Sequence, residues 1–282
     1  MGGAVAAHSP QMAVEQVTSH AGACASGRSR QQVGMASRLL EPLRSLGRSV
    51  VYYALPPRCA GCGDVIEEAG AFCPPCWNGM EWLGNDGCGR CGLPLLATEA
   101  DTCGRCLAEP AKLHRIRAAV AYDEMPRAIA LNLKYGRKVG LARTMARYMA
   151  PLKGAWDNEV LLVPVPLHRW RMWNRGFNQS MLVARELGRI WRIPAPHNVL
   201  RRIKRTQALK GMSHSQRRKA VAGAFHVAER AEVAGKTVIL IDDVLTSGST
   251  AEACAKALEK AGAARVELIC WARVVRPEQL MR

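Results

Sequence analysis

The residues with the clearest chemical potential in this chain lie between Val238 and Thr250. Four apolar residues, Val238 to Ile241, precede the adjacent carboxylates of Asp242 and Asp243. A continuous apolar run predicts a buried parallel strand, and ligands of such sheets lie beyond the carboxyl ends of the strands. We therefore expect the turn that follows to hold a phosphate, with the acids placed to engage sugar hydroxyls or a metal. The turn consists of Thr246, Ser247, Gly248, Ser249 and Thr250.

Cysteine spacing predicts a second kind of chemistry. Eight of the eleven cysteines form four Cys-x-x-Cys pairs, and two such pairs complete one tetrahedral four-cysteine zinc site. Disulfides or redox chemistry fit four closely spaced pairs less well, so we expect two zinc sites. The spacing leaves three ways of pairing open, of which consecutive pairing is the simplest. The expected ligands are Cys59, Cys62, Cys73, Cys76, Cys88, Cys91, Cys103 and Cys106.

Positive charge is concentrated in one part of the chain. The formal net charge is +17, and residues 164–220 carry fourteen Lys or Arg against one acid, Glu186. This pattern indicates nucleic acid or pyrophosphate as a partner, although a generic solvated basic face gives the same pattern. Trp170 and Trp173 alternate with arginines there, which is typical of single-stranded DNA binding but also of tryptophans packed against the zinc module. The candidate pyrophosphate or DNA contacts are His168, Arg169, Arg171 and Arg175.

Composition and apolar periodicity divide the chain into four parts. We expect a disordered tail over residues 1–35, an amphipathic helix over 36–56, the zinc-binding module over 57–110 and an α/β domain over 111–276. No stretch approaches the roughly 18 apolar residues that a membrane span needs, and no secretory signal pattern is present. We therefore expect a cytoplasmic protein without a membrane span.

Strands alternate with helices in the last part, which predicts a mostly parallel sheet flanked by helices. The expected strands are 117–122, 160–165, 199–203, 224–227, 237–241 and 265–274, of which the last closes the sheet. The expected helices are 126–134, 139–150, 177–190 and 249–261, with Asn174 and Asn178 as candidate caps. We expect the basic segments 164–179 and 204–219 to be loops that meet the Asp242 motif at one edge of the sheet, and the second to be mobile.

The order of these motifs resembles that of the ComF family. The matching motifs are the cysteine array, Pro-Val-Pro-Leu-His from Pro164, Arg-Gly-Phe-Asn-Gln from Arg175, Arg-Thr-Gln from Arg205, Gln-Arg-Arg-Lys from Gln216, Gly-Ala-Phe from Gly223, and the Asp242 motif. The resemblance covers about residues 40–274. It implies a zinc ribbon joined to a type I phosphoribosyltransferase-like domain and a link to DNA uptake in bacterial transformation. Ala220 departs from the family, which usually has Asn there.

By this resemblance, Thr246–Thr250 would bind the 5′-phosphate of phosphoribosyl pyrophosphate (PRPP), and Asp242 and Asp243 would hold the ribose hydroxyls. Magnesium would bridge ribose and pyrophosphate, the segment after Val163 would meet the pyrophosphate, and residues 204–219 would act as a lid. The expected partners are PRPP or a related ribose phosphate, single-stranded DNA and a DNA-uptake helicase.

Two functions stay open. The chain is either a DNA-uptake protein whose pocket is regulatory or structural, or a transferase that moves ribose 5-phosphate to an unidentified acceptor in salvage. The zinc sites would either stabilise the fold or contact nucleic acid. No residue stands out as a base for a particular acceptor.

Overall fold

The computed structural model describes residues 56–95, 101–108, 112–136, 138–157, 159–204 and 211–275. The expected tail, residues 36–55 of the expected amphipathic helix and the Arg205 motif lie outside these ranges. In the zinc-binding part, the short helices α2 (Pro74–Asn78) and α3 (Gly104–Ala108) each carry the last cysteine of one group. No helix in the described ranges is long and apolar enough to cross a bilayer.

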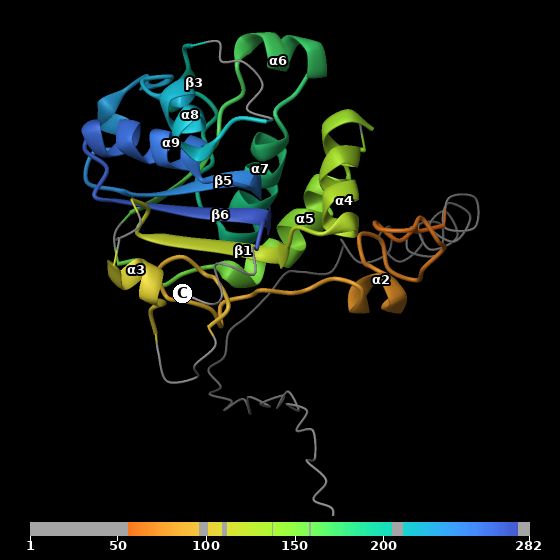
Figure 1. The fold of residues 1–282 in the computed structure, drawn as a ribbon. Helices are drawn as coiled ribbons and strands as arrows, with labels where there is room; N and C mark the ends of the chain where they lie inside the picture. The colour runs from red at the N-terminus through yellow and green to blue at the C-terminus, as the bar shows by residue number, and fades with distance from the viewer. Residues whose placement is uncertain are drawn as a thin grey trace, which may run out of the picture. The chain divides into compact units, whose positions relative to one another are not determined.

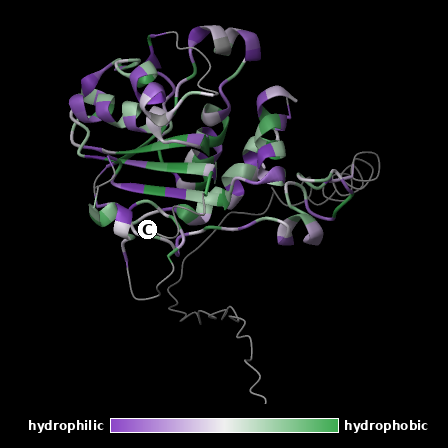
Figure 2. Cartoon of the chain, in the orientation of Figure 1, coloured by the Kyte–Doolittle hydropathy of each residue, from purple (hydrophilic) through white to green (hydrophobic). Residues whose placement is uncertain are grey.

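A four-stranded parallel sheet lies at the centre of the described chain (Figure 1), in the order β1-β6-β5-β2. Figure 2 shows hydrophobic residues along β5 and β6, as expected for strands covered on both faces. The expectation that residues 265–274 close the sheet was wrong, because β6 lies between β1 and β5. The four strands are β1 (Arg115–Ala121), β2 (Val160–Pro164), β5 (Thr237–Leu245) and β6 (Arg265–Arg273).

Helices cover both faces of this sheet. Side chains alternate along a strand, so Ile239 and Ile241 face α4, α5 and α7, whereas Val238 and Leu240 face α9. The apolar faces of the four helices complete two cores, one on each side of the sheet. These helices are α4 (Glu124–Tyr135), α5 (Leu141–Met149), α7 (Gln179–Trp191) and α9 (Ser249–Lys260), with a 3-10 turn η1 (Ala150–Leu152) after α5.

A two-stranded antiparallel sheet and helix α8 (His214–Val221) lie beside α9, and a further helix, α6 (Arg169–Arg175), follows β2 in the chain. The sheet pairs β3 (Leu200–Arg202) with β4 (Phe225–Val227), and a 3-10 turn η2 (Arg230–Glu232) follows. Helices α6 and α8 were both predicted as loop, and that prediction was wrong. Each has the capping chemistry of a helix: Gly176 ends α6 with φ 79°, and Ser213 forms a capping box with Gln216 at the start of α8.

The segment between the two groups of cysteines covers the free edge of β1. The backbone N–H of Leu83 donates to the carbonyl of Ala119 at 3.0 Å, and the N–H of Ala121 donates to the carbonyl of Glu81 at 2.9 Å. An uncovered edge would present unpaired N–H and C=O groups that favour aggregation. The zinc-binding part is therefore joined to the sheet by backbone pairing as well as by side chains.

Candidate functional site

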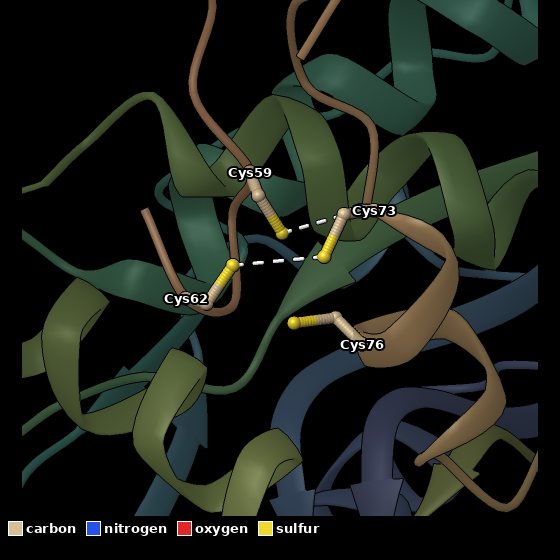
Figure 3. A group of neighbouring side chains, drawn as sticks. All are labelled: Cys59, Cys62, Cys73 and Cys76. Atoms are coloured by element: carbon tan, nitrogen blue, oxygen red, sulfur yellow. Dashed lines mark hydrogen bonds between the residues drawn. The ribbon is translucent and has the colours of Figure 1, made fainter. Parts of the chain in front are cut away.

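The cysteines gather into two groups, called here the first and the second tetrad. Within each, the four sulfur atoms lie within 4.8 Å of one another. The Sγ atoms of Cys62 and Cys73 are 3.6 Å apart (Figure 3), and those of Cys91 and Cys103 are 3.7 Å apart. Four thiolates around Zn²⁺ are about 3.8 Å apart at a Zn–S distance of about 2.3 Å. The chain therefore has two four-cysteine zinc-binding sites, and consecutive pairing is confirmed. The tetrads are Cys59, Cys62, Cys73 and Cys76, and Cys88, Cys91, Cys103 and Cys106.

Backbone N–H groups point at one sulfur of each tetrad. The amides of Gly61 and Cys73 donate to Cys59 Sγ at 3.4 and 3.3 Å, and the amide of Cys103 donates to Cys88 Sγ at 3.3 Å. Burial opposes ionisation of the Cys59 thiol, but these N–H donors outweigh it and lower its pKa to about 6. The same balance lowers the pKa of Cys88 to about 6. Because the thiolate is the metal ligand, each tetrad has one ligand that ionises readily at neutral pH.

The second tetrad is tied to the sheet by two buried arginines. Arg117 of β1 donates to the carbonyl of Cys88 at 3.2 Å, and Arg273 of β6 donates to the carbonyl of Cys91. Zinc held by four thiolates carries net negative charge, which these guanidinium groups offset. In the first tetrad, by contrast, Cys62 is exposed.

The acid pair, Asp242 and Asp243, lies inside β5 rather than after it. The prediction that the strand ends at Ile241 was wrong, because parallel pairing with β6 continues as far as Leu245. The two carboxylates contact different helices: Asp243 pairs with Lys134 of α4, and Asp242 accepts from Ser180 of α7. Each carboxylate consequently has its own set of partners.

Asp243 is buried, and its carboxylate forms an ion pair with Lys134 in the last turn of α4. The next residue, Tyr135, holds Arg175: the guanidinium donates to the phenol oxygen at 2.9 Å and lies 4.8 Å from the centre of its ring. Arg175 also donates to Gln179 Oε1 at 3.3 Å. Lys134 and Tyr135 were not predicted as site residues, because in the sequence they resemble the ordinary polar end of a helix.

Asp242 is partly exposed. Its Oδ1 accepts from the hydroxyl of Ser180 at 3.1 Å and from the backbone N–H of Asp243 at 2.9 Å. Burial, and then the charge of Asp243, raise the pKa of Asp242 to about 8. Asn178 caps α7 by accepting from the Ser180 amide at 3.0 Å, as predicted, whereas Asn174 lies inside α6. Ser180 was not predicted as part of the site.

The hydroxyl turn, Thr246–Thr250, leads from β5 into α9. Gly248 has φ 78°, a left-handed conformation that other residues adopt only with strain. The hydroxyl oxygens of Ser247 and Ser249 lie 3.1 Å apart at the start of α9. A helix N-terminus with hydroxyls beside it presents donors to an anion, so this turn stays the predicted phosphate site.

Helix α6 carries three of the four candidate anion contacts, Arg169, Arg171 and Arg175; the Arg171 side chain is outside what the structure describes. His168 caps this helix, since its Nδ1 accepts from the Trp170 amide at 3.3 Å. The indoles of Trp170 and Trp173 are 59% and 85% exposed and meet edge to face at 6.2 Å. They are therefore not packed against the zinc-binding part, which was one of the two alternatives for them.

A groove of about 840 Å³ lies between α6, α7 and β3, and it is called here the basic groove. Apolar side chains such as Met172 and Phe177 line part of it. No acid is among its lining residues, and neither the acid pair nor the hydroxyl turn contributes to it. Its arginines are Arg169, Arg185, Arg201 and Arg202.

Comparison with known proteins identifies the family. A double zinc ribbon domain model matches residues 50–107, and a phosphoribosyl transferase domain model matches residues 174–280. Competence protein F of Haemophilus influenzae is 30% identical over 219 residues, which cover 75% of this chain and 94% of that protein. The chain belongs to the ComF family.

Other ComF relatives match over similar lengths. DNA utilization protein YhgH of Salmonella typhimurium is 30% identical over 223 residues, covering 77% of this chain and 90% of that protein. Competence protein ComFC of Bacillus subtilis is 24% identical over 204 residues, covering 69% and 80%. The resemblance seen in the sequence is thus confirmed, as is the ComF architecture of a mostly parallel, helix-flanked sheet with four-cysteine zinc sites before it.

Proposed function

We propose that this ComF protein acts in DNA uptake in the cytoplasm, with a pocket for PRPP and a separate surface for single-stranded DNA. Relatives that match over most of their length are named for competence and DNA utilization. The observation that carries the pocket is the acid pair followed by the hydroxyl turn at the start of α9. A DNA-uptake helicase is the expected protein partner.

The polar groups of the pocket suit the different parts of PRPP. The hydroxyl turn would hold the 5′-phosphate, and the partly exposed Asp242 would accept from the ribose hydroxyls. Magnesium prefers oxygen donors and commonly keeps water and substrate phosphates as ligands. Because Lys134 already neutralises Asp243, the acid pair fits an ion delivered with the pyrophosphate better than a resident ion. Once bound, the ion would neutralise pyrophosphate charge.

Calorimetric titration with PRPP, with and without magnesium, tests the pocket. The variant that combines Asp242→Asn with Asp243→Asn is expected to lose magnesium-dependent PRPP binding. Asp157→Asn is the control: it removes a carboxylate at an exposed position outside the acid pair, and it is expected to bind PRPP like the wild type. Unchanged binding by the double variant would remove the basis for the pocket.

The basic groove and α6 support the DNA surface. The arginines that line the groove can hold phosphates, and exposed tryptophans give bases a stacking surface. Binding of a single-stranded oligonucleotide should weaken with salt, with a log–log slope of about −0.7 for each phosphate contacted. Replacing Arg185 and Arg201 with alanine should flatten that slope. Arg189→Ala, which removes a cation already paired with Glu186 at 2.7 Å, is the control. A salt-independent affinity of the wild type would contradict the DNA surface.

A second candidate function is transfer of ribose 5-phosphate from PRPP to an acceptor, favoured by the intact acid pair and hydroxyl turn. In that reaction the bond from ribose C1 to the pyrophosphate oxygen breaks, and pyrophosphate leaves with the electron pair. The acceptor forms a new bond to C1 and loses a proton. Pyrophosphate release from PRPP, measured against a panel of bases and amines with and without single-stranded DNA, tests this function. No release with any member would leave binding as the role of the pocket.

A further inference from the structure

The last turn of α4 brings an ammonium group to the acid pair. Lys134 reaches across to Asp243 on β5, whose side chain is 6% exposed, while the Lys134 side chain is 20% exposed. An ammonium has three N–H donors on a flexible stem. One of them is sufficient for the ion pair with Asp243. The others remain geometrically able to donate to a second anion from the solvent side.

Arg175 is brought to the same turn of α4 through the residue next to Lys134. Its guanidinium donates to Tyr135 and lies over that ring, and it also donates to Gln179. Both of these partners are neutral, so they orient the guanidinium without cancelling its charge. Lys134, which pairs with Asp243, and Tyr135, which orients Arg175, are therefore adjacent at the end of α4, so this turn links the acid pair with α6.

The two acids consequently differ in what they can do. Asp242 is partly exposed and accepts from Ser180 at the start of α7, whereas Asp243 is buried and paired with Lys134 of α4. A carboxylate that is buried and already paired is poorly placed to accept from a sugar hydroxyl. It is well placed to fix the position of a lysine, because a buried charge favours a close partner.

We propose that Lys134 and Arg175 bind the pyrophosphate group of PRPP, and that Asp243 is a positioning residue that holds Lys134 rather than a contact to the ribose. The proposal rests on the PRPP pocket proposed above and assigns the acid pair unequal roles. Asp242 and the hydroxyl turn serve the ribose 5-phosphate half of the ligand. Asp243, Lys134 and Arg175 serve the pyrophosphate half.

Titration calorimetry with PRPP, pyrophosphate and ribose 5-phosphate separates these roles. Lys134→Gln is expected to lower the affinity for PRPP and for pyrophosphate by about tenfold or more, the typical effect of losing a charged hydrogen bond. The affinity for ribose 5-phosphate should stay nearly unchanged. Asp243→Asn should give the same pattern more weakly. Asp242→Asn should weaken ribose 5-phosphate and PRPP. Lys138→Gln, which removes an exposed positive charge just beyond α4, is the matched control.

The outcomes separate a wrong assignment of Lys134 from a wrong assignment of the PRPP pocket. If Lys134→Gln weakened all three ligands equally, or none of them, the assignment of Lys134 to pyrophosphate would be wrong. If Asp243→Asn lowered the affinity for ribose 5-phosphate as much as Asp242→Asn does, Asp243 would be a ribose contact. If the wild type bound neither PRPP nor ribose 5-phosphate, the proposed pocket would fail.

A measurement on the wild type keeps the proposal testable if Lys134→Gln does not fold. The rate of chemical acetylation of Lys134 can be followed by peptide mass spectrometry after labelling of the folded protein. PRPP and pyrophosphate are expected to slow acetylation of Lys134 but not of Lys138, and ribose 5-phosphate is expected to have little effect. Acetylation of Lys134 at an unchanged rate in saturating PRPP would overturn the proposal.

Discussion

Arg273 of β6 donates to the backbone carbonyl of Cys91, which connects an interior strand of the sheet to the second zinc tetrad. Its guanidinium is buried, and Arg117 of the neighbouring strand β1 makes the matching contact with Cys88. Burying two positive charges is costly unless nearby negative charge offsets them. The zinc thiolates supply that charge, so zinc binding and the stability of the sheet are coupled.

Arg273→Met should therefore weaken zinc binding at the second tetrad. The variant keeps an apolar side chain of similar length and removes the charge and the hydrogen bond. Loss of such an outer partner typically lowers metal affinity about 10- to 100-fold. Competition with a chromophoric chelator measures the change. Arg58→Met is the control, because Arg58 makes a comparable contact, to the Gly63 carbonyl at 3.1 Å, but on the exposed surface of the first tetrad. Equal effects of the two variants would contradict the coupling.

The two tetrads should also release zinc at different rates. Cys62 in the first tetrad is exposed, whereas Cys88 in the second is fully buried. We expect a chelator to remove zinc in two phases, of which Cys62→Ser eliminates the fast one. Cys88→Ser should eliminate the slow phase and destabilise the chain by about 4 kcal/mol, as loss of a structural metal does. Release in a single phase would show that exposure does not control access.

Much of this fold could be predicted from local pattern. The apolar run before Asp242 indicated β5, and cysteine spacing indicated two metal sites. All the expected strands and helices of the α/β domain appear in the described ranges, with small shifts at most ends. The order of the strands could not be predicted, because no local pattern states that β6 enters between β1 and β5.

The elements and contacts that were not predicted from the sequence were missed for different reasons. Helix α8 did have a signal, the Ser-x-x-Gln of a capping box at Ser213 and Gln216, but the dense positive charge around it resembled a loop. Lys134 had no such signal in the sequence. A lysine in the last turn of a helix is common, because its charge interacts favourably with the helix dipole. Its partner Asp243 lies far away in sequence, so only the folded chain brings them together.

Removing Lys134 should cost more stability than removing the charge of Asp243. Lys134→Met leaves a buried carboxylate without its counter-charge, which typically costs about 3 kcal/mol or more. Asp243→Asn leaves a lysine that can turn toward solvent, so we expect a cost of about 1 kcal/mol. Urea unfolding of the zinc-loaded protein measures both. The double variant should recover part of the loss of Lys134→Met, and a strictly additive double variant would contradict this account of the pair.

Trp173 should contribute to DNA binding through its exposed ring. Trp173→Ala is expected to weaken the binding of a single-stranded oligonucleotide by about 1–3 kcal/mol, the usual contribution of one stacked base. Trp173→Phe keeps a ring and should retain most of the affinity. Fluorescence anisotropy at one fixed salt concentration gives both values. Wild-type affinity in Trp173→Ala would exclude this ring from the interface and leave the binding to the arginines.

Asp242 should make stability depend on pH in the direction opposite to that of most carboxylates. Burial, followed by the charge of Asp243, raises its pKa from 3.8 to about 8 in the folded chain. Between these values the folded state keeps a proton that the unfolded state has released. The free energy of unfolding contributed by this group is therefore fully present below about pH 4, falls as pH rises, and levels off above about pH 8.

Asp242→Asn isolates that contribution, because an amide does not titrate. Urea unfolding between pH 5 and pH 9 should show the wild type losing stability relative to the variant as pH rises, and the difference should become constant above about pH 8. The ligand supplies an independent check. Ribose hydroxyls donate to an ionised carboxylate, so the affinity of the wild type for ribose 5-phosphate should increase over the same range. If stability and affinity both lacked this dependence, the carboxylate would be ionised throughout, and Asp242 would not be the protonated acid that its surroundings favour.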